Sequence, residues 1–257
     1  MKTGNSVNKA YNIKMTIMYD GSRFQGWQRL GKGKETETIQ GILEYCISSF
    51  LKEEVTVIGS GRTDAGVHAY GQVANVHISR QVDLPSFQNQ INQSLPKEIQ
   101  IYEMEYVPDQ FHSRYDAKSK YYEYHIGTGE VESPFYRKQR LYIGEKLELD
   151  KMRKAAKYLC GTHDFSGFSS AMKDGRNTIK TIYEIKIIEK EQELVISYHG
   201  DGFLYNMIRI LTGTLLEVGG NKRSPESVLT VFEKKNRQLA GKTVEGKGLF
   251  LKKVVYK

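Results

Sequence analysis

The stretch "GSGRTDAGVHAYG", residues 59–71, places an arginine and an aspartate two positions apart among glycines and apolar residues. In an extended chain, Arg62 and Asp64 would point to the same face. The glycines at positions 59, 61, 66 and 71 let the backbone turn sharply or approach a ligand closely. Arginine favours the ionised form of a nearby aspartate, and an ionised carboxylate in a dry pocket is a competent nucleophile or base. The residues alone leave two alternatives open, a reactive site and a surface ion pair.

Strands are expected on both sides of this stretch, at "VTVI" (55–58) and "QVANVHI" (72–78). Alternating and helical apolar patterns elsewhere predict further elements. The other expected strands are 11–19, 101–107, 120–126, 181–189, 193–198 and 249–256, and the expected helices are 36–51, 84–96, 150–161, 202–220 and 224–235. Because strands and helices do not alternate strictly, we expect an α+β fold with a mixed, mostly antiparallel sheet.

A short echo links the two halves of the chain. "YDGSRF" (19–24) and "YHGDGF" (198–203) share the pattern Tyr-x-Gly-x-x-Phe, and each stands between an expected strand and an expected helix. With the order of elements, this echo predicts two similar subdomains. We place them at residues 11–110, which carry the GRTD motif, and 111–257.

The charge balance favours an anionic partner. The 257 residues carry a net charge of +8, with a pI of about 9.2, which points to nucleic acid first. The 17 tyrosines, set among lysines and arginines, suit RNA because bases stack on rings while phosphates meet cations. Packing within a sheet is the simpler explanation for any single tyrosine.

Several classes of protein are disfavoured. No apolar run approaches the ~18 residues of a membrane helix, and residues 1–12 resemble a short disordered lead-in rather than a signal peptide. Cys46 and Cys160 are predicted to be buried free thiols, which fits a reducing cytoplasm. The six histidines are spread without metal-ligand spacing, so we expect no metal.

Two other segments invite comparison with known motifs. "GWQRLGKG" (26–33) nearly matches the phosphate-binding loop of nucleotide hydrolases, but Gly33 stands where a hydroxyl should hold magnesium. A basic loop that touches RNA phosphates, or simply a solvated loop, explains it better. "GTHDFSGFSS" (161–170) contains His163, Asp164 and Ser166 without a nucleophile elbow, so we interpret it as a polar loop.

The longer string "GRTDAGVHAYGQVA" (61–74) resembles the signature of the TruA family of tRNA pseudouridine synthases. Further blocks resemble that family in the same order along nearly the whole chain, from about Tyr11 to Tyr256. They are "YDGSRFQGWQ", "FHSRYDAKSKYYEY", "GTHDFSGF", "GDGFLYNMIR" and "KGLFL".

The resemblance implies two α/β subdomains that flank a basic central cleft, and an active homodimer. It implies isomerisation of uridine to pseudouridine at positions 38, 39 and 40 in the anticodon stem-loop of tRNA, without metal or cofactor. By position in the motifs, Asp64 would be the catalytic aspartate and Arg209 its ion-pair partner. Arg62 would help to displace the base, and Tyr122 would stack on the target uracil.

Two departures from the family pattern keep alternatives open. "RLGKGKETET" (29–38) is longer and more basic than usual, which leaves the role of the basic loop 29–35 undecided, and "TVEGKGLFL" (243–251) lacks an alanine-proline pair. A paralogue that acts on another RNA, such as ribosomal RNA, remains open. So does a catalytically silent RNA-binding protein, whereas a nucleotide hydrolase acting through residues 26–33 is the weakest alternative.

Overall fold

The computed structural model describes residues 11–31, 33–170 and 177–256; residues 1–10 of the expected lead-in and Lys32 of the basic loop lie outside this part, whereas the last two lead-in residues, Tyr11 and Asn12, belong to the first strand. The described chain forms one ten-stranded sheet and five α-helices. The strands are β1 (Tyr11–Tyr19), β2 (Val57–Gly59), β3 (His68–Ile78), β4 (Ile99–Val107), β5 (Ser119–Gly127), β6 (Leu141–Tyr142), β7 (Gly161–Asp164), β8 (Ile179–Lys190), β9 (Glu193–Gly200) and β10 (Leu249–Val255). The helices are α1 (Ile39–Leu51), α2 (Leu84–Ser94), α3 (Leu149–Leu159), α4 (Met207–Gly219) and α5 (Ser227–Lys234).

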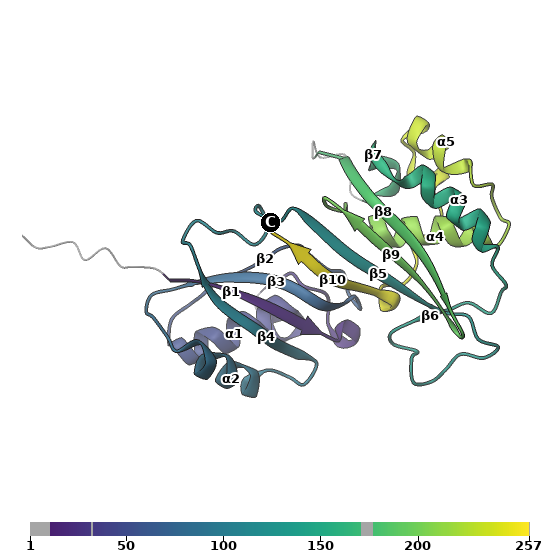
Figure 1. Cartoon of the computed structure of the whole chain (residues 1–257). Helices are drawn as coiled ribbons and strands as arrows, with labels where there is room; N and C mark the ends of the chain where they lie inside the picture. The colour runs from purple at the N-terminus through teal and green to yellow at the C-terminus, as the bar shows by residue number, and fades with distance from the viewer. Residues whose placement is uncertain (1–10, 32, 171–176, 257) are drawn as a thin grey trace, which may run out of the picture.

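The sheet runs in the order β4-β1-β3-β10-β5-β9-β8-β7, with β2 paired to β3 and β6 paired to β5. Only the β3–β10 and β5–β6 pairs of the described sheet are parallel. The predicted α+β class and the mostly antiparallel sheet are therefore confirmed. Figure 1 shows β10, from the end of the chain, lying between β3 and β5.

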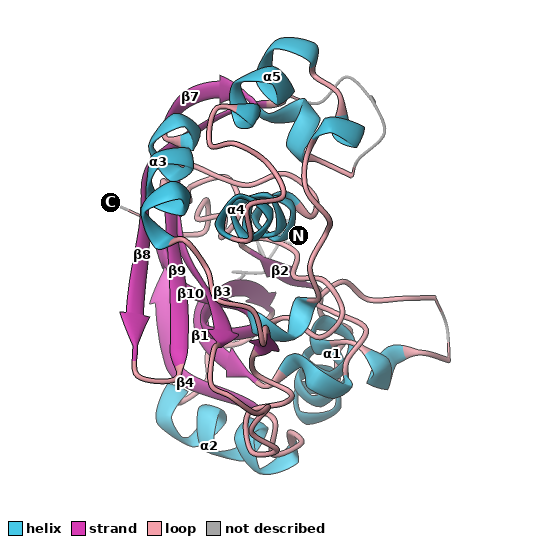
Figure 2. Ribbon diagram, turned by 90° about the vertical axis from the view of Figure 1, so that its right-hand side faces the viewer, coloured by secondary structure: helices cyan, strands magenta, loops and turns pink. Residues whose placement is uncertain are grey.

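Strand β10 separates two groups of elements that resemble the predicted subdomains. Strands β1–β4 lie on one side of β10, and β5 to β9 lie on the other. The two groups share one sheet, and α1 of the first group lies on the same side of it as α4 of the second (Figure 2). The exact boundary at residues 110 and 111, and the basic cleft, stay predictions.

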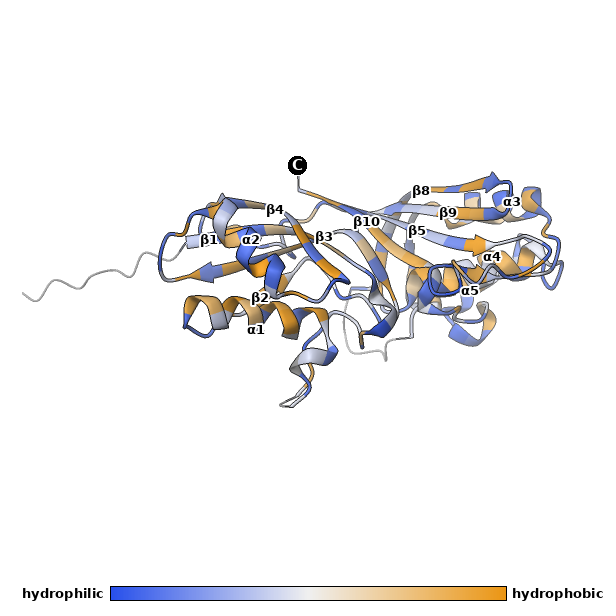
Figure 3. Ribbon diagram, turned by 90° about the horizontal axis from the view of Figure 1, so that it is seen from below, coloured by the Kyte–Doolittle hydropathy of each residue, from blue (hydrophilic) through white to orange (hydrophobic). Residues whose placement is uncertain are grey.

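Local chemistry explains where the two central helices begin. Helix α1 starts after Thr38, whose hydroxyl accepts a hydrogen bond from the Gly41 N–H at 3.3 Å. Its residues are mostly apolar (Figure 3) and nine of them are buried. Helix α4 starts at Met207, five residues later than the predicted start at Gly202, because Asn206 adopts a left-handed φ of 60°. Phe203 and Leu204 therefore lie in a loop, not in the helix.

Both cysteines are free thiols, as predicted. Cys46 is buried, whereas Cys160 is only partly covered, so the predicted burial is wrong for Cys160. Cys160 directly follows α3, at the point where the chain leaves the helix for β7. Among the described helices, none combines the length and the apolar character needed to cross a membrane.

Candidate active site

The GRTD motif forms a tight turn between β2 and β3 that is fastened to the chain after β1. The Val67 N–H donates to the Asp64 carbonyl at 3.1 Å, which closes the turn, and the Trp27 N–H donates to the Thr63 carbonyl at 3.0 Å. The hydroxyls of Tyr19 and Thr63 share a hydrogen bond of 2.8 Å in the buried interior. The backbone on both sides of the Asp64 side chain is thus held in place from the first half of the fold.

The segment that resembles a phosphate-binding loop supports this turn. Gly26 has a φ of +92°, and a Cβ at this position would lie 2.5 Å from the Thr63 carbonyl oxygen. Trp27 is buried, at 2% exposure. Arg29 forms an ion pair of 3.1 Å with the buried Glu44 of α1. These residues pack against the GRTD turn and α1, and they do not surround a phosphate.

Arg209 of α4 brings a cation to Asp64 from the other half of the chain. Its Nη1 lies 3.0 Å from Asp64 Oδ2, and the two side chains are 19% and 24% exposed. The same guanidinium donates from Nε to the Val244 carbonyl at 2.7 Å and from Nη1 to Asn206 Oδ1 at 2.7 Å. Arg209 therefore has a defined orientation, with its positive charge next to the Asp64 carboxyl group.

Tyr122 of β5 forms another side of the site. In the sheet register Tyr122 pairs with Leu251 of β10, which pairs with Ala69 at the start of β3, close to the GRTD turn. The Tyr122 ring is 7% exposed and packs edge-on against Phe203, with the ring centroids 5.3 Å apart. Burial raises the pKa of the Tyr122 hydroxyl, and the nearby Tyr19 and Asp64 raise it further, so this hydroxyl stays neutral.

Arg62 differs from the other predicted site residues. Its side chain is exposed, and among the described residues the ion-pair partner of Asp64 is Arg209. The surface ion pair of Arg62 with Asp64, one of the two alternatives that the residues alone left open, is thus not formed, and Asp64 contacts the arginine that the motif resemblance names. Asp64, Arg209 and Tyr122 come together, whereas Arg62 lies at the outer edge of the same turn.

Sequence reasoning missed several residues that shape the site. Asn206 and Phe203 orient Arg209 and Tyr122, and Tyr19 holds the turn through Thr63. The shared Tyr-x-Gly-x-x-Phe pattern contains Tyr19 and Phe203, so this repeat could have pointed to these two residues from the sequence alone.

The second polar segment has a structural role. His163 Nε2 lies 2.9 Å from the Cys160 carbonyl, and Asp164 accepts from the Ser166 N–H at 3.0 Å and pairs with Lys235 at 2.8 Å. The expected polar loop is wrong, because residues 161–164 form strand β7 and residues 165–168 form a 3-10 helix whose two phenylalanines are buried. No group of three potential metal ligands occurs among the residues that the structure describes.

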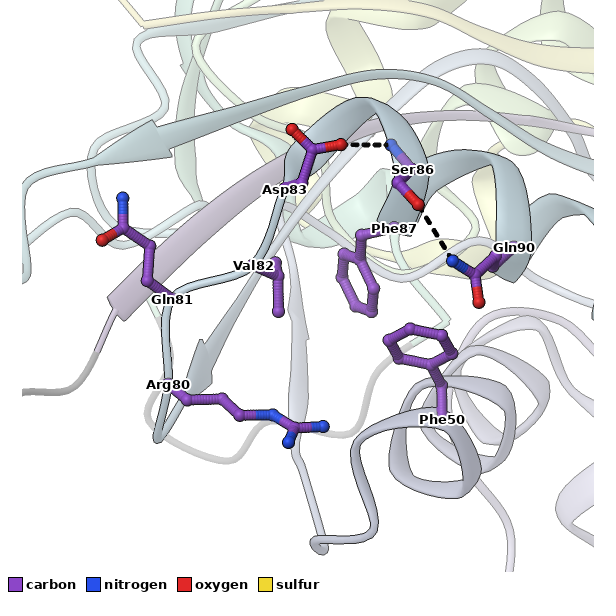
Figure 4. A pocket seen from close by; sticks show the side chains of 8 residues that line it. All are labelled: Phe50, Arg80, Gln81, Val82, Asp83, Ser86, Phe87 and Gln90. Atoms are coloured by element: carbon purple, nitrogen blue, oxygen red, sulfur yellow. Dashed lines mark hydrogen bonds between the residues drawn. The ribbon is translucent and has the colours of Figure 1, made fainter.

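A pocket of about 280 Å³ lies apart from the site, between α1 and the start of α2 (Figure 4). Its lining consists of Phe50, Arg80, Gln81, Val82, Asp83, Ser86, Phe87 and Gln90. Asp83 is engaged in capping α2 through the Ser86 N–H at 3.1 Å. The pocket shares no residue with the group around Asp64.

Comparison with known proteins identifies the family of this chain. A family model described as tRNA pseudouridine synthase matches residues 15–116 and 155–257. "tRNA pseudouridine synthase A" of Bacillus sp. (strain KSM-64) is 45% identical over 95% of this chain and 99% of its own length. The protein of the same name from Clostridium acetobutylicum is 42% identical over the same shares, and "tRNA pseudouridine synthase A 2" of Bacillus anthracis is 40% identical over the same shares.

A solved structure of the archaeal box H/ACA sRNP Nop10-Cbf5 complex aligns with a TM-score of 0.36 and 13% identity, over 79% of this chain and 43% of that chain. A likeness this weak carries no argument. The family model and the relatives do: this chain belongs to the tRNA pseudouridine synthase family, a family of isomerases. The resemblance seen in the sequence motifs is confirmed.

Proposed function

We propose that this protein isomerises uridine to pseudouridine in tRNA, with Asp64 as its catalytic carboxylate. The observation that carries the proposal is the partly buried Asp64–Arg209 pair beside the ring of Tyr122. The family membership and the names of the relatives support tRNA as the substrate. We extend the proposal to positions 38, 39 and 40 of the anticodon stem-loop, on the motif resemblance alone.

The reaction explains why one carboxylate suffices. The N1–C1′ bond breaks, and the uracil departs as an anion and turns within the site. C5 then bonds to C1′, C5 loses its proton to solvent or a base, and N1 takes up a proton. Glycosidases need a second carboxylate to activate water. Here no water enters, because the uracil that leaves C1′ through N1 is the same group that bonds to C1′ through C5. Asp64 attacks C1′ or removes a sugar proton, and both roles require an ionised carboxylate.

The uridine must leave the helical stack to reach Asp64, which costs a few kcal/mol. Stacking on an aromatic ring recovers about 1–3 kcal/mol per base, and we propose that Tyr122 provides this ring. We also propose that Arg62, whose side chain is exposed, enters the space that the base leaves. No step of this scheme requires a metal or cofactor.

The net charge of +8 supports binding through phosphates, so affinity for tRNA should fall steeply with salt. We propose that the basic loop 29–35 contributes to this binding, that the working unit is a homodimer, and that the protein acts in the cytoplasm. We also retain the two subdomains, 11–110 and 111–257, as flanks of a basic cleft.

The test is pseudouridine mapping in total RNA from cells with and without this protein, complemented by the wild type, by Asp64→Ala and by Asp150→Ala. Asp150 is a matched control because its side chain is 98% exposed on α3. We expect loss at tRNA positions 38–40, with rescue by the wild type and Asp150→Ala only. Loss of pseudouridine in ribosomal RNA alone would show that ribosomal RNA, not tRNA, is the substrate. Full rescue by a folded Asp64→Ala protein would overturn the mechanism. Wild-type protein that binds tRNA but never forms pseudouridine would indicate an RNA-binding protein.

A further inference from the structure

Two arginines beside the GRTD turn have side chains without a protein partner. Nine other arginines of the described chain donate to a carboxylate or to a main-chain carbonyl. Within residues 11–31, 33–170 and 177–256, only Arg62 and Arg114 have side chains with neither a hydrogen bond nor an ion pair, and both are exposed. Two unpaired guanidinium groups near one loop indicate an external anion.

The backbone before Arg114 is fastened to the strands that lead into the GRTD turn. The Ser113 N–H donates to Asn75 Oδ1 at 2.9 Å, and the Ser113 hydroxyl donates to the carbonyl of Ile58 in β2. The Tyr256 hydroxyl donates to the Ser113 carbonyl at 2.6 Å. Arg114 is therefore held at a fixed place beside β2, although its side chain is exposed.

Lys120 of β5 adds a third cation at this place. Its Nζ donates to the Ser60 carbonyl at 2.7 Å, and a Cβ at Gly61 would lie 2.7 Å from that Nζ. Burial, followed by the charge of Arg114, lowers the pKa of Lys120 to about 8. None of the carboxylates in the described part of the chain forms an ion pair with this ammonium group. A covered cation without a counter-ion is costly, and a bound anion would remove that cost.

We propose that Arg114 and Lys120 bind a backbone phosphate of the RNA beside the uridine that reaches Asp64. This subsite rests on the proposed function. Lys120 and Tyr122 lie two residues apart on β5 and share a face, which separates them by about 7 Å, the scale of one nucleotide. The planar fork of arginine suits two phosphate oxygens, while lysine contributes a point charge.

The experiment measures the affinity of an unmodified tRNA transcript as a function of KCl, in the Asp64→Asn background so that no substrate is consumed. The key variant is Arg114→Gln, whose exposed side chain has no partner to lose. Lys157→Gln is the matched control, since Lys157 is exposed on α3. Lys120→Met is measured as well, after a thermal melt shows that it is folded.

Losing one phosphate contact lowers the slope of log affinity against log salt by about 0.7–0.9. The advantage of the parent over Arg114→Gln should therefore shrink about threefold between roughly 50 and 200 mM KCl, while Lys157→Gln follows the parent. In the active protein, which keeps Asp64, the single substitution Arg114→Gln should raise KM and leave kcat nearly unchanged.

Two results would overturn the subsite. One is an Arg114→Gln protein that matches Lys157→Gln at every salt concentration. The other is an affinity loss that is constant with salt for both Arg114→Gln and Lys120→Met, because that pattern assigns these residues a purely structural role. Failure of the wild type to form pseudouridine in the same transcript would instead overturn the proposed function, whatever the slopes show.

Discussion

Arg209 Nη1 and Asp64 Oδ2 lie 3.0 Å apart although 145 positions separate the two residues in the chain. Asp64 belongs to the turn before β3 and Arg209 to the first turn of α4, so this contact joins the two groups of strands on either side of β10. Removing one member of a partly buried pair leaves the other charge uncompensated. A substitution of Arg209 should therefore affect both the packing of the two groups of strands and the reactivity of the Asp64 carboxylate.

The first prediction concerns the shape of the Arg209 side chain. Arg209→Lys keeps the charge but cannot reach Asp64, Asn206 and Val244 together. We expect kcat to fall at least about tenfold for Arg209→Lys and about 100-fold for Arg209→Gln, with KM within about threefold. Arg223→Lys is the control, because Arg223 pairs with Glu217 at 3.1 Å and is also 19% exposed. Single-turnover kinetics on a tRNA transcript will show whether Arg209→Lys is as active as Arg223→Lys, which would contradict this role.

The second prediction separates the ring of Tyr122 from its hydroxyl. The hydroxyl has no hydrogen bond to any described residue, and burial raises its pKa, so Tyr122→Phe should keep stability and stay within about threefold of wild-type kcat/KM. Tyr122→Leu keeps the apolar bulk but loses the flat ring. Because stacking contributes about 1–3 kcal/mol, its kcat/KM should fall roughly 5- to 150-fold. Equal losses in both variants would instead give the hydroxyl a chemical role.

The third prediction concerns Gly26, which supports the turn from outside. An alanine there would need a strained φ of +92° and would place its Cβ 2.5 Å from the Thr63 carbonyl. We expect Gly26→Ala to lose about 2–4 kcal/mol of stability, or roughly 5–10 °C in Tm for a chain of this size, and to lose activity. Gly31→Ala is the control, because a Cβ at Gly31 meets no atom within 4 Å. Calorimetry measures the Tm of both variants, and equal Tm values would contradict the predicted strain at Gly26.

The fourth prediction uses pH. Burial lowers the pKa of Lys120 from 10.5 to about 8, so the folded state binds fewer protons than the unfolded state between these values. The penalty on folding is complete below pH 8 and disappears above about pH 10.5. The wild type should therefore gain stability relative to Lys120→Met as pH rises through this window, by at most roughly 1.4 kcal/mol per pH unit.

Urea unfolding of both proteins at pH 7.5 and pH 10 measures this difference, in which the shared titrations cancel. Lys157→Met provides the comparison for a lysine whose side chain is exposed. A difference between the wild type and Lys120→Met that stays constant over this range would show that Lys120 is not desolvated as its surroundings indicate.

Much of the fold was readable from local patterns because long elements repeat their periodicity. The strand 11–19 and the helices within 36–51 and 84–96 lie where apolar spacing predicted them. The strands β6 and β7, of two and four residues, are too short to show a period. The predicted start of α4 at Gly202 failed because Phe203 and Leu204 continue the apolar spacing, whereas Asn206 interrupts the helical backbone.

The site residues could be predicted only in part, because local patterns do not show contacts between distant segments. The pairing of Arg62 with Asp64 assumed an extended chain, in which alternate residues share a face. Arg62 instead has an exposed side chain, and Asp64, which begins a turn closed by the hydrogen bond from the Val67 N–H to its carbonyl, contacts Arg209. Motif resemblance named Arg209, but no local pattern indicates a contact across 145 positions. The repeated Tyr-x-Gly-x-x-Phe pattern has a physical basis, since Tyr19 and Tyr198 each share a buried hydrogen bond of 2.8 Å with a threonine.

The central place of β10 has a consequence during synthesis on the ribosome. Strands β3 and β5 are neighbours of β10 and not of each other, so the parts of their edges at residues 68–69 and 119–124 find no partner until residues 249–255 have left the exit tunnel. Until then both edges expose unpaired backbone groups, which invite association with other nascent chains. Translation must therefore run past Val255 before the two halves can join, and a ribosome that stalls earlier would release a chain that needs chaperone protection.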